Sequence, residues 1–153
     1  MPSSKKGRHS EKGRCGLAFG EPPTNNIPSS KDHPSEKRRR LETGQTFERL
    51  AAVFFEQNGF EILQRNWRTG RREIDLIVKK GSLIAFVEVK SASSKKYGHP
   101  ANRVDERKIA NLTKAAQQYL IDNKIENYDL RFDVVTFVNG KLEHFPDAFP
   151  ATD

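Results

Sequence analysis

The sequence predicts an α/β protein in which helices cover a mixed β-sheet. Three observations support this fold class: helical periodicity in two separate segments, short runs of strand character after each, and one run that is apolar on both faces. The predicted order is one helix, three strands, a second helix and two strands. Because a helix stands between strands, a mixed sheet is favoured over a sandwich or a helical bundle.

The first helix is expected from about Leu41 to Asn58, where the dipeptide Asn58-Gly59 is typical of a helix C-terminus. Its apolar residues recur at helical spacing: Phe47, Leu50, Ala51, Phe54 and Phe55. Strands are expected over 60–67, 73–78 and 83–89, separated by Gly70 and by Lys80-Gly81-Ser82. The run 83–87 is apolar on both faces, which indicates a central strand covered on both sides.

A second helix is expected over 104–120, with Asp105 near its start. Its apolar stripe consists of Ile109, Leu112, Ala116, Tyr119 and Leu120. A closing hairpin is predicted from the strands 131–138 and 141–145, because Asn139-Gly140 between them is a turn dipeptide favoured in two-residue hairpins.

The composition allows one modest globular domain in this 153-residue chain, with 35% apolar and 31% charged residues. No apolar run is long enough for a transmembrane helix, and the first residues lack the apolar region of a secretory signal. The single cysteine, Cys15, excludes an intramolecular disulfide, and with four scattered histidines it offers no zinc spacing. We therefore expect a cytoplasmic protein that does not associate with membranes.

Residues 1–40 are predicted to form a disordered basic tail, because they hold five of the eight prolines and many serines and glycines. They carry ten Lys and Arg against four Asp and Glu, and so account for most of the net charge of +7. A transit peptide is the alternative for the basic start, and nonspecific phosphate affinity is the alternative for the run 37–40. The expected domain spans 41–149 and is nearly neutral, and 150–153 form the C-terminal end.

Charged side chains interrupt two neighbouring strands in this domain. Glu88 and Lys90 share one face of their strand because alternate residues do so. Asp75 is expected with Glu73 and Ile77, opposite an apolar face formed by Ile74, Leu76 and Val78. If the two strands pair through the Lys80-Gly81 turn, Asp75 and Glu88 approach each other, and two such anions need a cation between them.

Oxygen-only ligands favour Mg²⁺ or Mn²⁺ over zinc. Glu48, on the shoulder of the first apolar helix stripe, is the candidate for a third carboxylate at this site. An ordinary same-face ion pair is the alternative for Glu88 and Lys90, and a helix-surface glutamate is the alternative for Glu48. Charges inside an otherwise apolar strand are costly unless they are paired or metal-bound, which favours the active-site interpretation.

Two basic clusters flank the expected site. Arg65, Arg68, Arg71 and Arg72 surround Trp67, and Lys95 and Lys96 lie near Tyr97 and His99 in the loop after Lys90. Both clusters suit a groove that follows a nucleic-acid backbone, with a solvated rim as the alternative. Lys108 is either a solvated lysine or a residue that contacts phosphate or supports the site. Asp133 with Arg131 is interpreted as a structural pair.

These motifs resemble a known family. Ile74-Asp75 followed by Glu88-Val89-Lys90 looks like the PD-(D/E)XK signature of restriction endonuclease-like nucleases. An ordered series from about Leu41 to Phe149 resembles, more specifically, the bacterial YraN-like family, which is related to archaeal Holliday junction resolvases. The series consists of Gly44, Glu48 and Ala51, then Gln64-Arg65-Asn66-Trp67-Arg68, Glu73-Ile74-Asp75-Leu76-Ile77, Phe86-Val87-Glu88-Val89-Lys90, Lys108, Arg131-Phe132-Asp133-Val134-Val135 and Ala148-Phe149.

The resemblance implies a restriction endonuclease-like core of order α-β-β-β-α-β. It implies Glu48, Asp75, Glu88 and the backbone carbonyl of Val89 as Mg²⁺ ligands, and Lys90 as the catalytic base. Three positions depart from the family pattern: Arg72 and Phe47 stand where Gly is usual, and Ala92 stands where Arg is usual. These departures leave the metal and lysine positions unchanged and concern how substrate phosphates are held.

The leading hypothesis is a Mg²⁺- or Mn²⁺-dependent endonuclease that hydrolyses phosphodiester bonds. DNA is favoured over RNA, and a branched or single-stranded structure is favoured over a sequence motif, because no sequence-reading module is present. A homodimer would place two sites on two strands. One alternative is a catalytically inactive nucleic-acid-binding module on the same fold. Another is an assembly protein whose basic tail contacts RNA or acidic partners.

Overall fold

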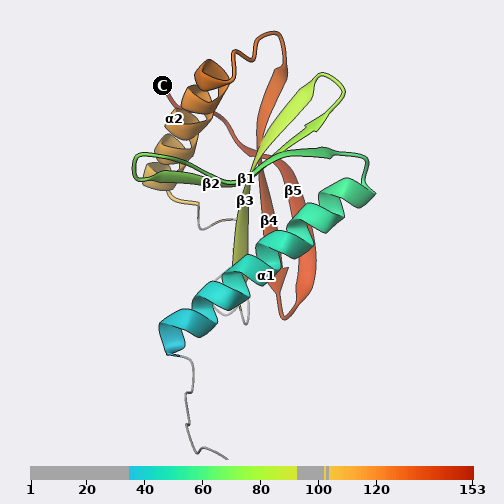
Figure 1. Cartoon of the computed structure of the whole chain (residues 1–153), viewed down its shortest axis with the longest axis vertical. Coiled ribbons are helices and arrows are strands. Elements are labelled where there is room, and N and C mark those ends of the chain that lie inside the picture. Colours follow the sequence, from blue (N-terminus) through green and yellow to red (C-terminus); the bar gives the residue numbers. More distant parts are fainter. Residues whose placement is uncertain (1–34, 93–101, 103) are drawn as a thin grey trace, which may run out of the picture. The chain divides into compact units, whose positions relative to one another are not determined.

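The computed structural model describes residues 35–92, 102 and 104–153. Helices and strands follow one another in the predicted order (Figure 1). The elements are α1 (Glu36–Gln57), β1 (Glu61–Thr69), β2 (Arg72–Lys80), β3 (Leu83–Ala92), α2 (Glu106–Asp122), β4 (Asp129–Val138) and β5 (Lys141–Phe149). The strands form one sheet in the order β1-β2-β3-β4-β5, in which β3 and β4 are parallel and all other neighbours are antiparallel. The predicted α/β class is confirmed, and the architecture is compatible with a restriction endonuclease-like core.

The sheet has an apolar core on each face, as expected for a central strand that is apolar on both sides. On one face, α2 packs over a cluster that includes Ile77, Phe86 and Val134. On the other face, α1 packs over a cluster that includes Val87 and Val135. The strand β3 lies between β2 and β4, and so contributes to both clusters.

The helix α1 begins at Glu36, earlier than the boundary we expected between residues 40 and 41. Ser35 caps it, because Ser35 Oγ accepts a hydrogen bond from the backbone N–H of Arg38. Ion pairs one helical turn apart, Arg40 with Glu36 and Arg38 with Glu42, support the first turns. Residues 1–34 of the predicted tail lie outside the described residues.

The apolar stripe of α1 differs from the prediction at two positions, Leu50 and Ala52. Ala51, Ala52 and Phe55 are buried, whereas Leu50 is 47% exposed. The narrow buried stripe is sufficient because only one side of α1 faces the sheet. Neither helix in the described part of the chain is long and apolar enough to cross a bilayer.

The second half of the chain follows its prediction closely. Asp105 caps α2 by accepting a hydrogen bond from the backbone N–H of Lys108 at 2.7 Å. Asn139 and Gly140 have φ angles of 51° and 76°, as a two-residue hairpin turn requires. The strand β5 continues beyond the expected residue 145 to Phe149.

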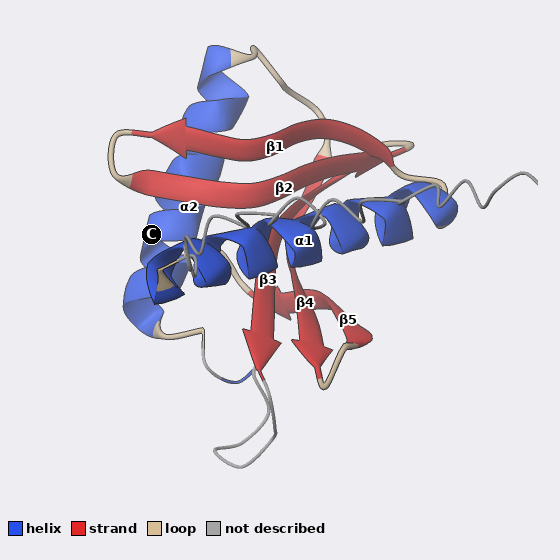
Figure 2. Cartoon of the chain, turned by 60° about the horizontal axis from the view of Figure 1, so that its bottom comes forward, coloured by secondary structure: helices blue, strands red, loops and turns tan. Residues whose placement is uncertain are grey.

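The β1–β2 hairpin changes direction near the expected site. Figure 2 shows β1 and β2 running across the direction of β3 and β4. Within β1, Asn66 has a φ of 49°, which interrupts the alternation of an extended strand. The alternation is broken in β2 as well: Leu76 and Val78 pack under α1, whereas Ile74 joins the cluster under α2. The predicted single apolar face of Ile74, Leu76 and Val78 is therefore wrong.

Candidate active site

Asp75 lies where β2 separates from β3. The paired residues of the β2–β3 ladder run from Lys80 and Leu83 to Leu76 and Val87 and include no pair beyond that point. One residue further along β2, Asp75 Oδ2 accepts a hydrogen bond of 2.7 Å from the backbone N–H of Val89. The carboxylate of Asp75 thus takes the place of a strand neighbour and is held against β3.

Glu88 is the second carboxylate of the site and is only 6% exposed. Lys108 Nζ lies 3.0 Å from Glu88 Oε2, and Lys90 Nζ lies 3.8 Å from Glu88 Oε1. The Lys108 contact is an ion pair without hydrogen-bond geometry, so Oε2 has no hydrogen-bond donor in the described structure. Lys108 therefore contacts Glu88 and is not a fully solvated lysine, and its role at the site stays a prediction.

The charge of Glu88 acts on Asp75. Burial, followed by the negative charge of Glu88, raises the pKa of Asp75 from 3.8 to about 8. The hydrogen bond from Val89 and the charge of Lys108 act in the opposite direction, and Glu48 adds to the increase. The charge of Lys108 therefore does not offset the effect of burial and of Glu88 on the pKa of Asp75.

Glu48 and Asp75 line a common hollow of about 370 Å³ beneath α1. The other residues lining it are Arg40, Leu41, Gly44, Gln45, Asn66, Arg68 and Glu73. Asp75 and Glu73 share this side of the sheet as expected, but Ile77 does not, because it packs under α2. The prediction that Glu48 reaches the site from α1 agrees with this hollow.

The donor set fits a hard divalent cation. Glu48, Asp75 and Glu88 offer oxygen ligands only, which suits Mg²⁺ or Mn²⁺. The raised pKa of Asp75 and the Glu88 oxygen without a donor both indicate that additional positive charge would be stabilising here. The described residues do not, however, contain a preformed group of three His, Cys, Asp or Glu side chains close enough to hold an ion.

Glu88, Lys90 and Lys108 do not line this hollow, and the other expected site residues lie in several different environments. Arg68 lines it and pairs with Glu73 at 3.0 Å. Arg65 pairs with Glu56 at 3.9 Å on the same face, and the buried Nε of Arg72 has no hydrogen-bond partner in the described structure. Lys95 and Lys96 lie outside the described residues. Trp67 packs edge-on against Tyr119 under α2, and so is a core residue.

A second buried carboxylate, Asp133, has a structural environment. It is fully buried and accepts two hydrogen bonds from Arg131, at 2.8 and 3.0 Å, and one from the backbone N–H of Asp147 at 3.1 Å. His144 Nε2 lies 2.8 Å from the same carboxylate. The pairing with Arg131 was predicted, whereas the contacts from β5 were not, because a bulge between the paired residues of β4 and β5 creates them.

The fold and this site define an α/β protein with a half-buried and a buried carboxylate, and two partly exposed lysines, at the end of the β2–β3 ladder. The model of the "Uncharacterised protein family UPF0102" matches residues 47–137. A UPF0102 protein of Chloroherpeton thalassium is 46% identical over 95 residues, covering 62% of this chain and 74% of its own length. A UPF0102 protein of Chlorobium phaeobacteroides is 38% identical over 114 residues, covering 68% of this chain and 90% of its own length. A UPF0102 protein of Persephonella marina is 36% identical over 106 residues, covering 69% of this chain and 91% of its own length. This chain belongs to the UPF0102 family, which is YraN-like.

Proposed function

We propose that this protein is a divalent-cation-dependent endonuclease that hydrolyses phosphodiester bonds in DNA. The observation that carries the proposal is the pair of carboxylates formed by the half-buried Asp75 and the buried Glu88, set beside Lys90 and Lys108 at the place where two strands separate. A protein that only bound nucleic acid would gain nothing from carboxylates that repel phosphate. Such a pair is typical of a site that needs a cation.

Glu48, Asp75, Glu88 and the carbonyl of Val89 are the proposed ligands of Mg²⁺ or Mn²⁺. The N–H and C=O groups of one extended residue point to the same side, so the Val89 carbonyl faces the gap that β2 leaves. When bound, the ion would polarise the scissile phosphate and lower the pKa of the attacking water.

The lysines have different proposed roles. Lys90 is 24% exposed on the side chain and lies beside Glu88, so its Nζ can contact a phosphate oxygen or exchange a proton with the attacking water. Lys108 holds the carboxylate of Glu88 in place from α2. Lys90 is therefore the proposed catalytic residue, and Lys108 is a positioning residue.

Cleavage of labelled DNA tests this proposal. Linear duplex, single-stranded and four-way-junction DNA are incubated with the full chain, with Mg²⁺, Mn²⁺ or a chelator, and a duplex RNA of the same sequence is included. We expect cleavage of at least one DNA substrate with a divalent cation and none with the chelator. The preferred substrate then reports whether branched DNA is favoured.

Replacing Lys90 by Ala is expected to lower the cleavage rate by about 100-fold or more, because a positioned general acid or base contributes about 10²- to 10⁴-fold. The matched control is Lys141→Ala, which removes the same charge from an exposed residue at the start of β5. DNA binding with no cleavage in any metal would refute the nuclease and support the inactive binding module. Equal rates for Lys90→Ala and Lys141→Ala would refute the role of Lys90.

A further inference from the structure

The first turns of α1 extend away from the sheet (Figure 1). Residues 36–43 are all exposed, and they lie outside the stretch matched by the family model. A helix of this kind receives little stabilisation from tertiary packing, which normally supplies most of helical stability in proteins. Local caps and ion pairs maintain it instead. Its exposed surface is therefore available to a partner.

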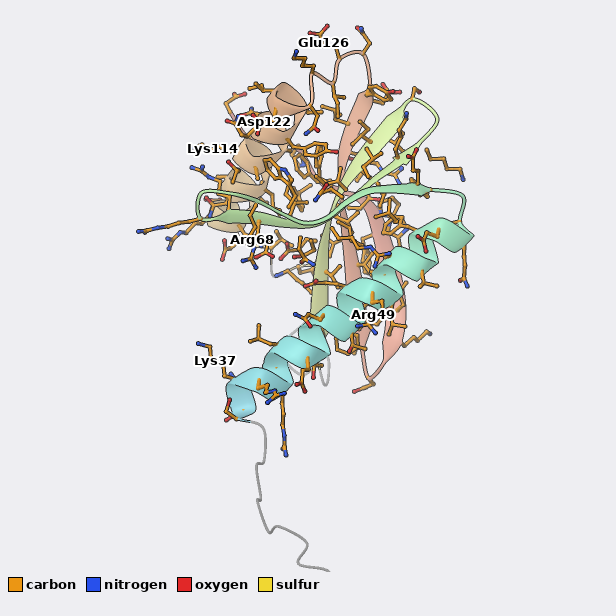
Figure 3. All side chains as sticks on the ribbon, in the orientation of Figure 1. Lys37, Arg49, Arg68, Lys114, Asp122 and Glu126 are labelled. Atoms are coloured by element: carbon orange, nitrogen blue, oxygen red, sulfur yellow. The ribbon has the colours of Figure 1, made fainter. Side chains whose placement is uncertain are left out.

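One face of this projecting helix leads to the candidate active site. At about 100° per residue, Lys37 lies within about 20° of the angular position of Glu48, and Gly44 lies between them on the same stripe. Arg39 lies on the opposite side of the helix, about 180° from Glu48. Figure 3 shows Lys37 on the same side of α1 as Arg68.

Two neighbouring hollows on this face share the lining residues Arg40 and Leu41. The outer hollow, of about 470 Å³, is lined by Glu36, Lys37, Arg40 and Leu41. The inner hollow contains Asp75 and Glu48 and is also lined by Arg40 and Leu41. The outer hollow thus carries two exposed cationic side chains, Lys37 and Arg40, and one carboxylate, Glu36, which pairs with Arg40, whereas the inner hollow carries the carboxylates of Glu48, Glu73 and Asp75. The outer hollow suits a phosphate, and the inner hollow suits a cation.

Gly44 lies in the middle of α1 and lines the inner hollow. Glycine costs about 1 kcal/mol relative to alanine within a helix. Apart from the neighbouring backbone of α1 itself, no atom of the described structure lies within 4 Å of the place where a Cβ would stand, so packing does not require this glycine. Glycine is typical of places where a ligand closely approaches the backbone.

We propose that the α1 stripe formed by Lys37, Arg40 and Gly44 binds the phosphate backbone of a DNA strand and leads it to the carboxylate site. This inference rests on the proposed nuclease function and specifies its substrate. Lys37 is eleven residues from Glu48, which is about 16 Å along the helix axis. At about 3.4 Å per nucleotide, the strand must extend roughly five nucleotides beyond the cleaved phosphate on one side.

Salt-dependent DNA binding by the full chain tests the stripe without requiring cleavage. Binding of a labelled duplex is measured by fluorescence anisotropy in a chelator, over a range of salt concentrations. For Lys37→Ala we expect the slope of log K against log salt to fall by about 0.9, and the Kd to rise roughly 5- to 10-fold at 0.1 M salt. The matched control, Arg39→Ala, removes one positive charge from the same part of α1 but from its opposite side. Its slope should therefore equal that of the wild type. Equal slopes for the two variants would overturn the proposal.

Gly44→Leu provides a second test that is separate from charge. Leucine is a good helix former and its Cβ meets open space, so the melting temperature should not fall. We expect the Kd for DNA to rise at least about fivefold, because the side chain fills the hollow through which the strand passes. Unchanged DNA binding by this variant would contradict the proposed path.

These results separate the two proposals. Cleavage with equal slopes for Lys37→Ala and Arg39→Ala would refute the stripe and leave the nuclease intact. Absence of cleavage with the expected difference in slope would refute the nuclease and leave the stripe as a DNA-binding surface. Duplexes shortened on one side add a further check, since wild-type binding should weaken when the flank falls below about five base pairs, whereas Lys37→Ala should respond less.

Discussion

Replacing Asp75 by Asn is expected to increase the free energy of unfolding of the metal-free protein at pH 8 and to abolish cleavage. Because the folded-state pKa of Asp75 is about 8 and its ordinary value is 3.8, the unfolded chain loses this proton at a lower pH than the folded chain does. Stability contributed at this position therefore falls as the pH rises between these two values, by up to about 1.4 kcal/mol per pH unit. Asn remains neutral throughout, and its carbonyl oxygen can still accept the hydrogen bond from Val89.

Urea unfolding in a chelator at pH 5 and pH 8 measures this effect. The advantage of Asp75→Asn over the wild type should be larger at pH 8. Asp122→Asn, an exposed carboxylate at the end of α2, is the control and should change little at either pH. A variant that is less stable than the wild type at pH 8 would show that Asp75 is well stabilised as an anion without a cation.

The same variant reports on the cation. A ligand that binds only the folded state stabilises by RT ln(1 + [L]/Kd), which is about 2.7 kcal/mol at a concentration of 100 Kd. Mg²⁺ or Mn²⁺ should therefore raise the melting temperature of the wild type and have little effect on Asp75→Asn. An equal response of both proteins would place the cation elsewhere.

Replacing Asp133 by Asn is expected to destabilise the protein by about 3–5 kcal/mol, the cost of breaking a buried ion pair. The amide would turn a donor towards groups that already donate, Arg131 and the backbone N–H of Asp147. Burial alone would raise the pKa of Asp133, but the hydrogen bonds from His144, Arg131 and Asp147 lower it below 3.8. Asp133 therefore stabilises the fold above about pH 4, and this contribution is lost as the pH falls further.

Urea unfolding at pH 7 and pH 3 checks the sign of this effect. The difference between the wild type and Asp133→Asn should be large at pH 7 and smaller at pH 3. Asp129→Asn, at the exposed start of the same strand, is the matched control. A difference that grows towards low pH would contradict the assignment of Asp133 as a stabilised anion.

The sequence predicted the order of the elements because local signals agreed with the fold. Periodicity identified both helices, and Asn139-Gly140 identified the last hairpin. The start of α1 was missed because composition suggested a tail, whereas Ser35 and pairs such as Arg38 with Glu42 are sufficient to support a helix. A polar composition indicates that a segment buries little apolar surface. A helix cap and ion pairs within the helix can stabilise it without such burial.

The candidate site was predicted in part. The alternation of side chains along a strand predicted that Glu88 and Lys90 share a face, and their side chains lie 3.8 Å apart. The predicted pairing of the two strands through the Lys80-Gly81 turn set Asp75 beside Glu88, and the charge of Glu88 acts on Asp75. Alternation failed for Ile74, because β2 changes direction where it leaves β3, so that Ile74 packs under α2 while Leu76 and Val78 pack under α1. The partners of Glu88 and Asp133 on other elements, Lys108 and His144, depend on tertiary packing. Spacing along the chain contains no information on such contacts.

The hydrogen bond from Val89 to Asp75 links the chemistry of the site to the mechanics of the sheet. Val89 belongs to β3, whose other neighbour is β4, and both strands are built into the cores on the two faces. A bound cation that contacts the Asp75 carboxylate would therefore act through this hydrogen bond on the central strands of the sheet. Binding of a cation at this site should therefore slow amide-proton exchange in the central strands of the sheet more than it orders a surface loop.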